Sequence, residues 1–222
     1  VNNVETLANV PSIIKKGGDW YASIGTEQSK GTKLFSLSGN IARTGVVEVP
    51  FGMTLRRLVE ELGGGVPNGH KLKALQLGGA MLGFIPASQI DLPIDFEGLV
   101  SIGSGVGSGG LVVIDESACM VDVAYMLMSF AQSECCGKCL IGRLGTKQML
   151  DILQDITNGG GQPEDMDLLA ELGESMALGS LCPLCGGAPD PVASILRHFR
   201  DELEAHIKER RCPAGVCQGL TQ

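Results

Sequence analysis

Two kinds of hydrophobic periodicity divide the chain at about residue 114. Apolar and polar positions alternate over residues 33–38 and again over 46–49, which predicts two strands joined by a turn. Short apolar runs bounded by glycine follow, and we expect them to be strands as well; they cover residues 72–77, 99–102 and 111–114. This part of the chain is therefore predicted to form a sheet.

Helical spacing of apolar residues appears once between the strands and then throughout the second half. Thr54 is a good N-cap for a helix with apolar residues three and four positions apart, at Leu55, Leu58, Val59 and Leu62. From about Asp115 the period becomes helical. Four helices are expected there: one around 117–133, one over 146–156, one from 163 and one from 191 to about 207. The order of elements predicts an α+β chain.

Two cysteine turns interrupt the helical half. Each contains a Cys-x-x-Cys motif, at Cys136–Cys139 and at Cys182–Cys185. This spacing lets both sulfurs of one turn face the same ion, and two such turns can close one tetrahedral thiolate site. The chain has 8 cysteines and no export signal, so metal or cluster ligands are favoured over disulfides. Structural zinc and an iron–sulfur cluster both fit this pattern.

Composition excludes several classes of partner. The net charge of -8 leaves no broad basic face for nucleic acid, and aromatic residues make up only 4%, too few to stack bases. No run of about 18 apolar residues is present, so we expect no direct membrane insertion. The glycine-rich segment 103–110 is followed by a strand pattern, whereas a phosphate-binding loop needs a helix behind it. A cytoplasmic protein is expected, either free or peripheral to a membrane complex.

Several motifs together resemble one family. They are NVETLANVP at 3–11, SGN at 38–40, CGKC at 136–139, SLC at 180–182 with APDPV at 188–192, and FRDE at 199–202. They resemble the NADH-binding flavoprotein subunit of respiratory complex I and its relatives in NAD(P)-linked hydrogenases and formate dehydrogenases. The closing motif CPAGVC at 212–217 is more similar to the hydrogenase branch. The resemblance covers nearly the whole chain but only the C-terminal part of the family protein.

The resemblance implies a domain order. Residues 1–30 would be the tail end of a flavin and nucleotide domain, and 31–114 a soluble-ligand-binding β-grasp domain. Residues 115–210 would be a four-helix bundle that binds a [4Fe-4S] cluster, and 211–222 a tail leading to a missing or further metal-binding segment. The first residue, Val1, fits a fragment or a processed chain. Whether the flavin domain is missing from the gene or only from this chain is not decided by the sequence.

The resemblance also implies cofactors and their sites. FMN and NAD(P) would bind in the intact protein, with Val1, Asn2, Asn3 and Thr6 at the edge of the FMN pocket. The family's first cysteine turn, Cys-Gly-Lys-Cys-x-Pro-Cys-Arg, supplies three cluster ligands, and its third position is Gly142 here. The second turn supplies one ligand in the family, yet this chain adds Cys185. The expected [4Fe-4S] ligands are therefore Cys136, Cys139, Cys182 and Cys185, with Cys135 in reserve.

The implied function is electron relay. Single electrons would pass from FMN through the cluster to a partner iron–sulfur subunit, and this chain alone is not expected to be active as a dehydrogenase. The alternative is a non-catalytic, zinc-stapled assembly module that uses the two cysteine turns. The preference for NADH or NADP, the complex and the terminal acceptor are left open.

The tail offers a second candidate metal site. His206, Cys212 and Cys217 are three soft ligands at close spacing, and zinc is a candidate ion there. Its fourth ligand could be Cys185, which would then be lost to the cluster. A plain surface role for His206 is the alternative. Cys119 lies on an apolar helix face and is interpreted as a small buried hydrophobic residue.

Overall fold

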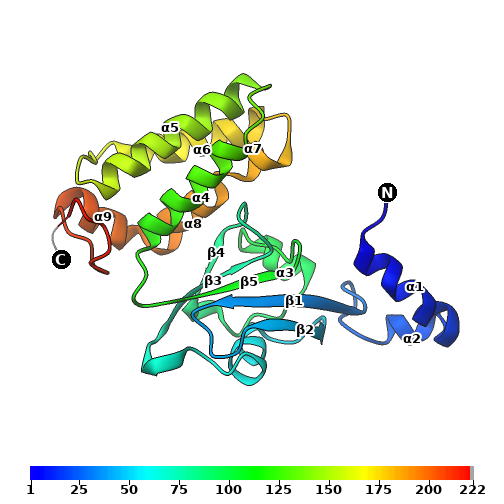
Figure 1. Cartoon of the computed structure of the whole chain (residues 1–222). Helices are drawn as coiled ribbons and strands as arrows, with labels where there is room; N and C mark the ends of the chain where they lie inside the picture. The colour runs from blue at the N-terminus through cyan, green and yellow to red at the C-terminus, as the bar shows by residue number, and fades with distance from the viewer. Residues whose placement is uncertain (221–222) are drawn as a thin grey trace.

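The structure is a computed structural model that describes residues 1–220. Its first segment contains the helices α1 (Val4–Lys16) and α2 (Gly18–Ala22), which lie to one side of the sheet (Figure 1). Asn3 caps α1, because its Oδ1 accepts a hydrogen bond of 2.8 Å from the Glu5 amide. The apolar residues of α1 are largely exposed: Val4, Leu7, Val10 and Ile14.

Within residues 1–220, five strands form one mixed sheet. The strands are β1 (Thr32–Gly39), β2 (Gly45–Pro50), β3 (Leu72–Leu77), β4 (Phe84–Pro86) and β5 (Gly110–Asp115). Their order is β2-β1-β5-β3-β4, and only the central β1–β5 pair is parallel. The alternation expected for residues 33–38 is observed, since Phe35 and Leu37 are buried while Leu34 is exposed.

Two elements of the sheet region differ from the sequence-based expectation. Residues 99–102 were expected to be a strand, which is wrong: α3 (Phe96–Ser101) covers most of them, and Asp95 caps it through a 2.7 Å bond from the Gly98 amide. The helix expected from Thr54 begins there but continues as the π-helix η1 (Arg57–Leu62). Its apolar residues Leu55, Leu58 and Val59 are buried under the sheet as predicted.

The second half is helical. It contains α4 (Met120–Glu134), α5 (Leu140–Thr157), α6 (Asp165–Gly179), α7 (Pro183–Gly187), α8 (Asp190–His198) and α9 (Arg200–Lys208). The second cysteine turn, expected to be a connection, forms the short helix α7. The helix expected from Pro191 to Ile207 is broken at Phe199, whose φ of -134° lies outside the helical range. In Figure 1 the helices α4 to α9 lie together above the sheet.

Two groups of buried apolar residues stabilise the described part of the chain. One lies between the sheet, η1 and α3, and the other lies among the helices. Ala74, Phe84 and Ile114 come from strands yet belong to the helical group, so the two halves pack directly together. Ser194 of α8 accepts a 2.9 Å hydrogen bond from the Phe84 amide of β4 at this contact. None of the helices between residues 1 and 220 is long and apolar enough to cross a membrane.

Candidate metal centres

The two cysteine turns meet at one end of the helical half. Cys139 is the residue that precedes α5, and Cys182 is the residue that precedes α7. Gly137 adopts a φ of 73°, a left-handed conformation that suits glycine and closes the first turn. Pro183 begins α7 with a ring that fits the first helical position. One cysteine of each turn, Cys139 and Cys182, therefore lies at a helix N-terminus.

Four cysteine sulfurs from the two turns lie close together. The Sγ atoms of Cys135 and Cys185 are 3.4 Å apart. The Cys139 sulfur accepts hydrogen bonds from the amides of Leu181 and Gly142, which lower the pKa of this thiol. Cys185 also contacts the thiols of Cys139 and Cys182. The structure thus brings the sulfurs of the first and second turns into one group.

The cysteines of this group differ in exposure. Cys185 is only 1% exposed, and its burial raises the pKa of the thiol. Cys135, Cys139 and Cys182 are partly buried, whereas Cys136 is exposed. Cys136 was expected to be a ligand with Cys135 in reserve, and here Cys135 is the member of that pair whose sulfur touches Cys185.

A second group of metal-binding side chains is more compact. In the described residues, the ligand atoms of Cys119, His206, Cys212 and Cys217 all lie within 4.8 Å of one another, and all four residues are buried. His206 Nε2 is 3.3 Å from the Cys119 sulfur and 3.5 Å from the Cys217 sulfur. This group combines the three tail residues expected from the sequence with one residue from the start of α4.

Hydrogen bonds orient the ligand atoms of the second group. The Nδ1–H of His206 donates to the Glu202 carbonyl at 2.7 Å, which leaves Nε2 facing the sulfurs. Burial opposes protonation of His206, but its contacts with Cys119 outweigh burial and raise the pKa of the imidazole to about 9. The bond to Cys217 is the largest cause that lowers the pKa of Cys119, to about 4. A thiolate beside an imidazole is the chemistry of a zinc ligand set.

Cys119 is the member of the second group that the sequence did not indicate as a candidate ligand. It was interpreted as a small hydrophobic residue, and its side chain is indeed 1% exposed. The fourth ligand considered for the tail was Cys185, which lies instead with the first cysteine turn. The signal for Cys119 was weak, because 87 positions separate it from His206.

The four residues expected at an FMN edge lie at the start of the chain. Val1, Asn2 and Asn3 are exposed, and the Asn3 side chain caps α1. Asn3 and Thr6 line a pocket of about 380 Å³ that also includes Lys30, Lys33 and Tyr21. Glu5 and Lys33 form an ion pair across it.

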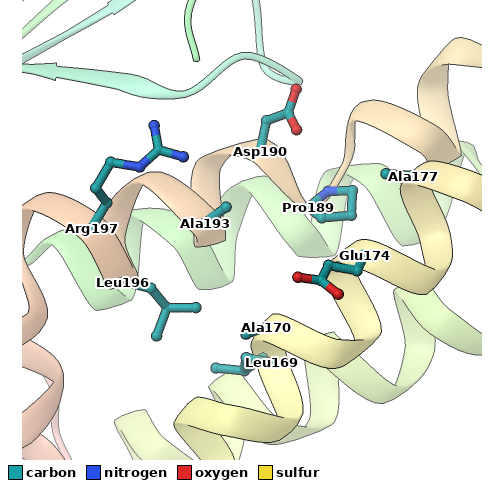
Figure 2. A pocket seen from close by; sticks show the side chains of 10 residues that line it. Leu169, Ala170, Glu174, Ala177, Pro189, Asp190, Ala193, Leu196 and Arg197 are labelled. Atoms are coloured by element: carbon teal, nitrogen blue, oxygen red, sulfur yellow. The ribbon is translucent and has the colours of Figure 1, made fainter. Parts of the chain in front are cut away.

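A pocket of about 450 Å³ lies between α6 and α8. Figure 2 shows Asp190 and Arg197 projecting from one side of α8, while Leu196 and Leu169 lie on the side nearer α6. Arg197 donates a 3.2 Å hydrogen bond to the Ile102 carbonyl, and burial raises the pKa of Asp190. The residues that line this pocket are mainly alanine, leucine and glycine and include no cysteine, so the pocket is distinct from both groups of metal-binding side chains.

Comparisons with known proteins agree with the division of the chain into a sheet-containing half and a helical half. Residues 122–206 match the family described as NADH-ubiquinone oxidoreductase-F iron-sulfur binding region, and residues 34–85 match the SLBB domain. The first match contains both cysteine turns. The chain is 46% identical to NADP-reducing hydrogenase subunit HndC of Solidesulfovibrio fructosivorans over 99% of its own length and 45% of that protein.

Two further relatives give the same result. The F 2 subunit of the NADH-quinone oxidoreductase of Rhizobium meliloti is 42% identical over 96% of this chain and 51% of the relative. A crystal structure of an NAD+-reducing [NiFe]-hydrogenase in the H2-reduced state superposes with a TM-score of 0.84 at 32% identity, over 94% of this chain and 34% of that one. The chain spans about half the length of the curated relatives it matches. It belongs to the family of NADH-quinone oxidoreductase F subunits and related hydrogenase subunits, with an iron–sulfur binding region at residues 122–206.

Proposed function

We propose that the two cysteine turns hold a [4Fe-4S] cluster through which this chain relays single electrons. The observation that carries the proposal is the meeting of sulfurs 50 positions apart, Cys135 and Cys185, inside a matched iron–sulfur binding region. When bound, such a cluster accepts and releases one electron at a time. The donor set fits it, because thiolates are the ligands that iron–sulfur clusters take from proteins.

The chain's own groups would hold and tune this cluster. Cys139, Cys182 and Cys185 supply three thiolates, and the adjacent pair Cys135 and Cys136 supplies the fourth. The resemblance favours Cys136 as that ligand and the sulfur contacts favour Cys135, so Cys135→Ser and Cys136→Ser, compared for iron content, identify it. The amide N–H groups of Leu181 and of Gly142, in the first turn of α5, donate to the Cys139 sulfur and stabilise negative charge there.

The surface around the turns suits contact with another protein. Leu140, Leu144 and Leu181 are all more than half exposed beside the sulfurs. Exposed apolar residues at one place are typical of a docking surface. The relatives are named as subunits of a hydrogenase and a quinone oxidoreductase, and we propose that this chain also associates with iron–sulfur subunits of a multi-subunit oxidoreductase. A cytoplasmic location, free or peripheral to a membrane complex, follows from that proposal.

FMN and NAD(P) belong to the proposal for the longer protein. Val1, Asn2, Asn3 and Thr6 would form one edge of the FMN pocket, and the pocket beside Asn3 and Thr6 supports this position. Hydride transfer from NAD(P)H to FMN would precede the single-electron steps. We expect no dehydrogenase activity from residues 1–222 alone.

The finer domain description is part of the same proposal. Residues 31–114 would be a β-grasp domain, supported by the SLBB match and by a mixed sheet that packs on η1. Residues 115–210 would be the four-helix cluster domain, with α4, α5, α6 and the broken α8–α9 pair as its helices. Residues 1–30 would complete the flavin domain, and the tail from 211 would carry ligands of a second metal.

We propose zinc for the second group, formed by Cys119, His206, Cys212 and Cys217. Three thiolates and one imidazole are a common set for structural zinc, and all four ligands are protein side chains, which leaves no position for substrate. The amides of Val216 and Cys217 donate to the Cys212 sulfur, as expected for a thiolate that binds a metal. This zinc would fasten the tail to α4.

Anaerobic purification followed by metal and sulfide analysis tests the main proposal. About four iron atoms and four sulfides per chain, a brown colour and a low-temperature EPR signal after reduction would support it. A colourless chain with two zinc ions would overturn it and favour the alternative, a zinc-stapled assembly module. The variant Cys119→Ser serves as a control, because it should lower zinc content and leave iron unchanged.

A further inference from the structure

We infer that Cys185 is a cluster ligand whose sulfur occupies the space that a side chain at residue 142 would need. The proposal rests on the electron-relay function and names one residue pair within it, Cys185 and Gly142. A Cβ atom built on Gly142 would lie 2.8 Å from both the Cβ and the sulfur of Cys185, and 2.7 Å from the Cys139 sulfur. Real Cβ atoms essentially never come so close to another heavy atom.

Residue 142 must therefore be glycine, because the neighbouring cysteines leave no room for a side chain there. Gly142 is buried in the first turn of α5 and has an ordinary helical backbone, so its conformation would accept other residues. A glycine inside a helix costs about 0.5–1 kcal/mol relative to alanine, and its presence needs a packing reason. The reason here is that α7 brings Cys185 against this face of α5.

The neighbouring turn of α5 shows the same close approach. A Cβ atom on Gly145 would lie 2.6 Å from two atoms of the Met176 side chain of α6. Gly142 and Gly145 thus form a glycine face on α5 that lets α6 and α7 pack closely. Only at Gly142 are the approaching atoms sulfurs of a metal-binding group.

Cys185 holds the central position among those sulfurs. It contacts Cys135, Cys139 and Cys182, and it is the most buried of the set. A cysteine placed at residue 142 would direct its sulfur into the same space from α5. Side chains at residues 142 and 185 cannot both fit beside the Cys139 sulfur, so the fourth sulfur comes from one of these two residues.

A double-variant experiment tests this exchange. We would prepare the wild type, Cys185→Gly, Gly142→Cys and the double variant Gly142→Cys/Cys185→Gly, because only glycine at residue 185 removes both the Cβ and the sulfur that lie against residue 142. Each protein is reconstituted anaerobically, and iron and sulfide per chain are measured with circular dichroism as a check on folding. We expect about four iron atoms in the wild type and in the double variant, and at least a twofold lower content in folded Cys185→Gly. Retention of four iron atoms by Cys185→Gly would overturn the inference.

The cluster-free proteins provide a second measurement. Gly142→Cys alone places a side chain against Cys185, so its melting temperature should fall below that of the wild type. Adding Cys185→Gly removes that contact and leaves only the Cys139 sulfur nearby, so it should recover part of the loss. If the two substitutions change the melting temperature additively, residues 142 and 185 do not compete for the same space, since residues in contact are expected to couple. A wild type that binds no iron would instead defeat the electron-relay function, so the two failures are distinct. Low iron in the double variant despite a native circular dichroism spectrum would also overturn the exchange.

Discussion

Lys73 of β3 and Glu202 of α9 form an ion pair of 2.7 Å between the sheet and the helices. Both side chains are mostly buried, with exposures of 16% and 11%. Lys73 also donates to the Ala118 carbonyl at 2.5 Å, and Glu202 accepts from the Met120 amide at 3.1 Å. Three chain segments therefore meet at this pair, next to Cys119 of the second group of metal-binding side chains.

Loss of the negative charge at this pair should destabilise the chain strongly. Glu202→Gln leaves the Lys73 ammonium largely buried without its partner, and we expect a loss of about 3–5 kcal/mol in the free energy of unfolding. Urea denaturation followed by circular dichroism measures it. Glu204→Gln is the matched control on the same helix, because its ion pairs are exposed and should contribute less than about 1 kcal/mol. Equal effects of the two variants would contradict the prediction.

The hydrogen bond between Ser194 and Phe84 should also be measurable. Ser194→Ala leaves the buried Phe84 amide without an acceptor, and such a loss costs about 1–3 kcal/mol. Ser101→Ala removes an exposed hydroxyl and should change stability by less than about 0.5 kcal/mol. The measurement is the difference between the unfolding free energies of Ser194→Ala and Ser101→Ala, and a difference near zero would refute the prediction.

Asp115 should make stability depend on pH in the acid range. Burial alone would raise the pKa of its carboxyl, but bonds from the Ser117 hydroxyl and amide and the nearby His70 together lower it below the usual 3.8. A depressed folded pKa stabilises the fold above the unfolded value, and this contribution disappears as the pH falls through the folded value.

The matched variant for this effect is Asp115→Asn. We expect its deficit in unfolding free energy to be full at pH 7 and to shrink as the pH falls below 3.8. Denaturation of both proteins across this range gives the curve. A deficit that stays constant with pH would show that the charge of Asp115 is not the cause.

The cysteines of the two cysteine turns should differ in their rate of reaction with a thiol reagent. In the chain without metal, Cys136 is exposed whereas Cys185 is buried with a raised pKa. Iodoacetamide reacts with accessible thiolates, so we expect Cys136 to be alkylated at least about tenfold faster than Cys185. Peptide mass spectrometry at timed quenches reads both rates, and comparable rates would argue against the packing of α7 on α5.

Zinc removal should loosen the tail. A metal that binds only the folded state at a thousandfold excess over its Kd stabilises by about 4 kcal/mol. We expect a chelator to lower the melting temperature of the wild type and to have little effect on His206→Ala. A wild type that contains zinc yet melts unchanged after its removal would contradict a structural role.

Local patterns in the sequence were sufficient to predict the helices and strands whose formation depends on residues close to one another in the sequence. The strand periodicity of residues 33–38 and the helical spacing after Asp115 both appear in the structure, because burial follows those periods directly. The prediction of a strand at 99–102 was wrong because a short apolar run fits a strand and a buried helix equally well. Asp95, which caps α3, was a sequence signal for the helix. Cys119 could not be found this way, since its partners depend on how α4 and α9 pack.

A zinc ion in the second group of metal-binding side chains would also set an order of events during synthesis. Cys119 lies at the start of α4, and Cys217 comes 98 positions later, so a zinc ion that joins them closes a very long loop. The ion can offset the entropy lost in closing that loop only after Cys217 has emerged from the ribosome. The base of the helical half would therefore reach its final form only then, when the ion joins the start of α4 to the segment around Cys217.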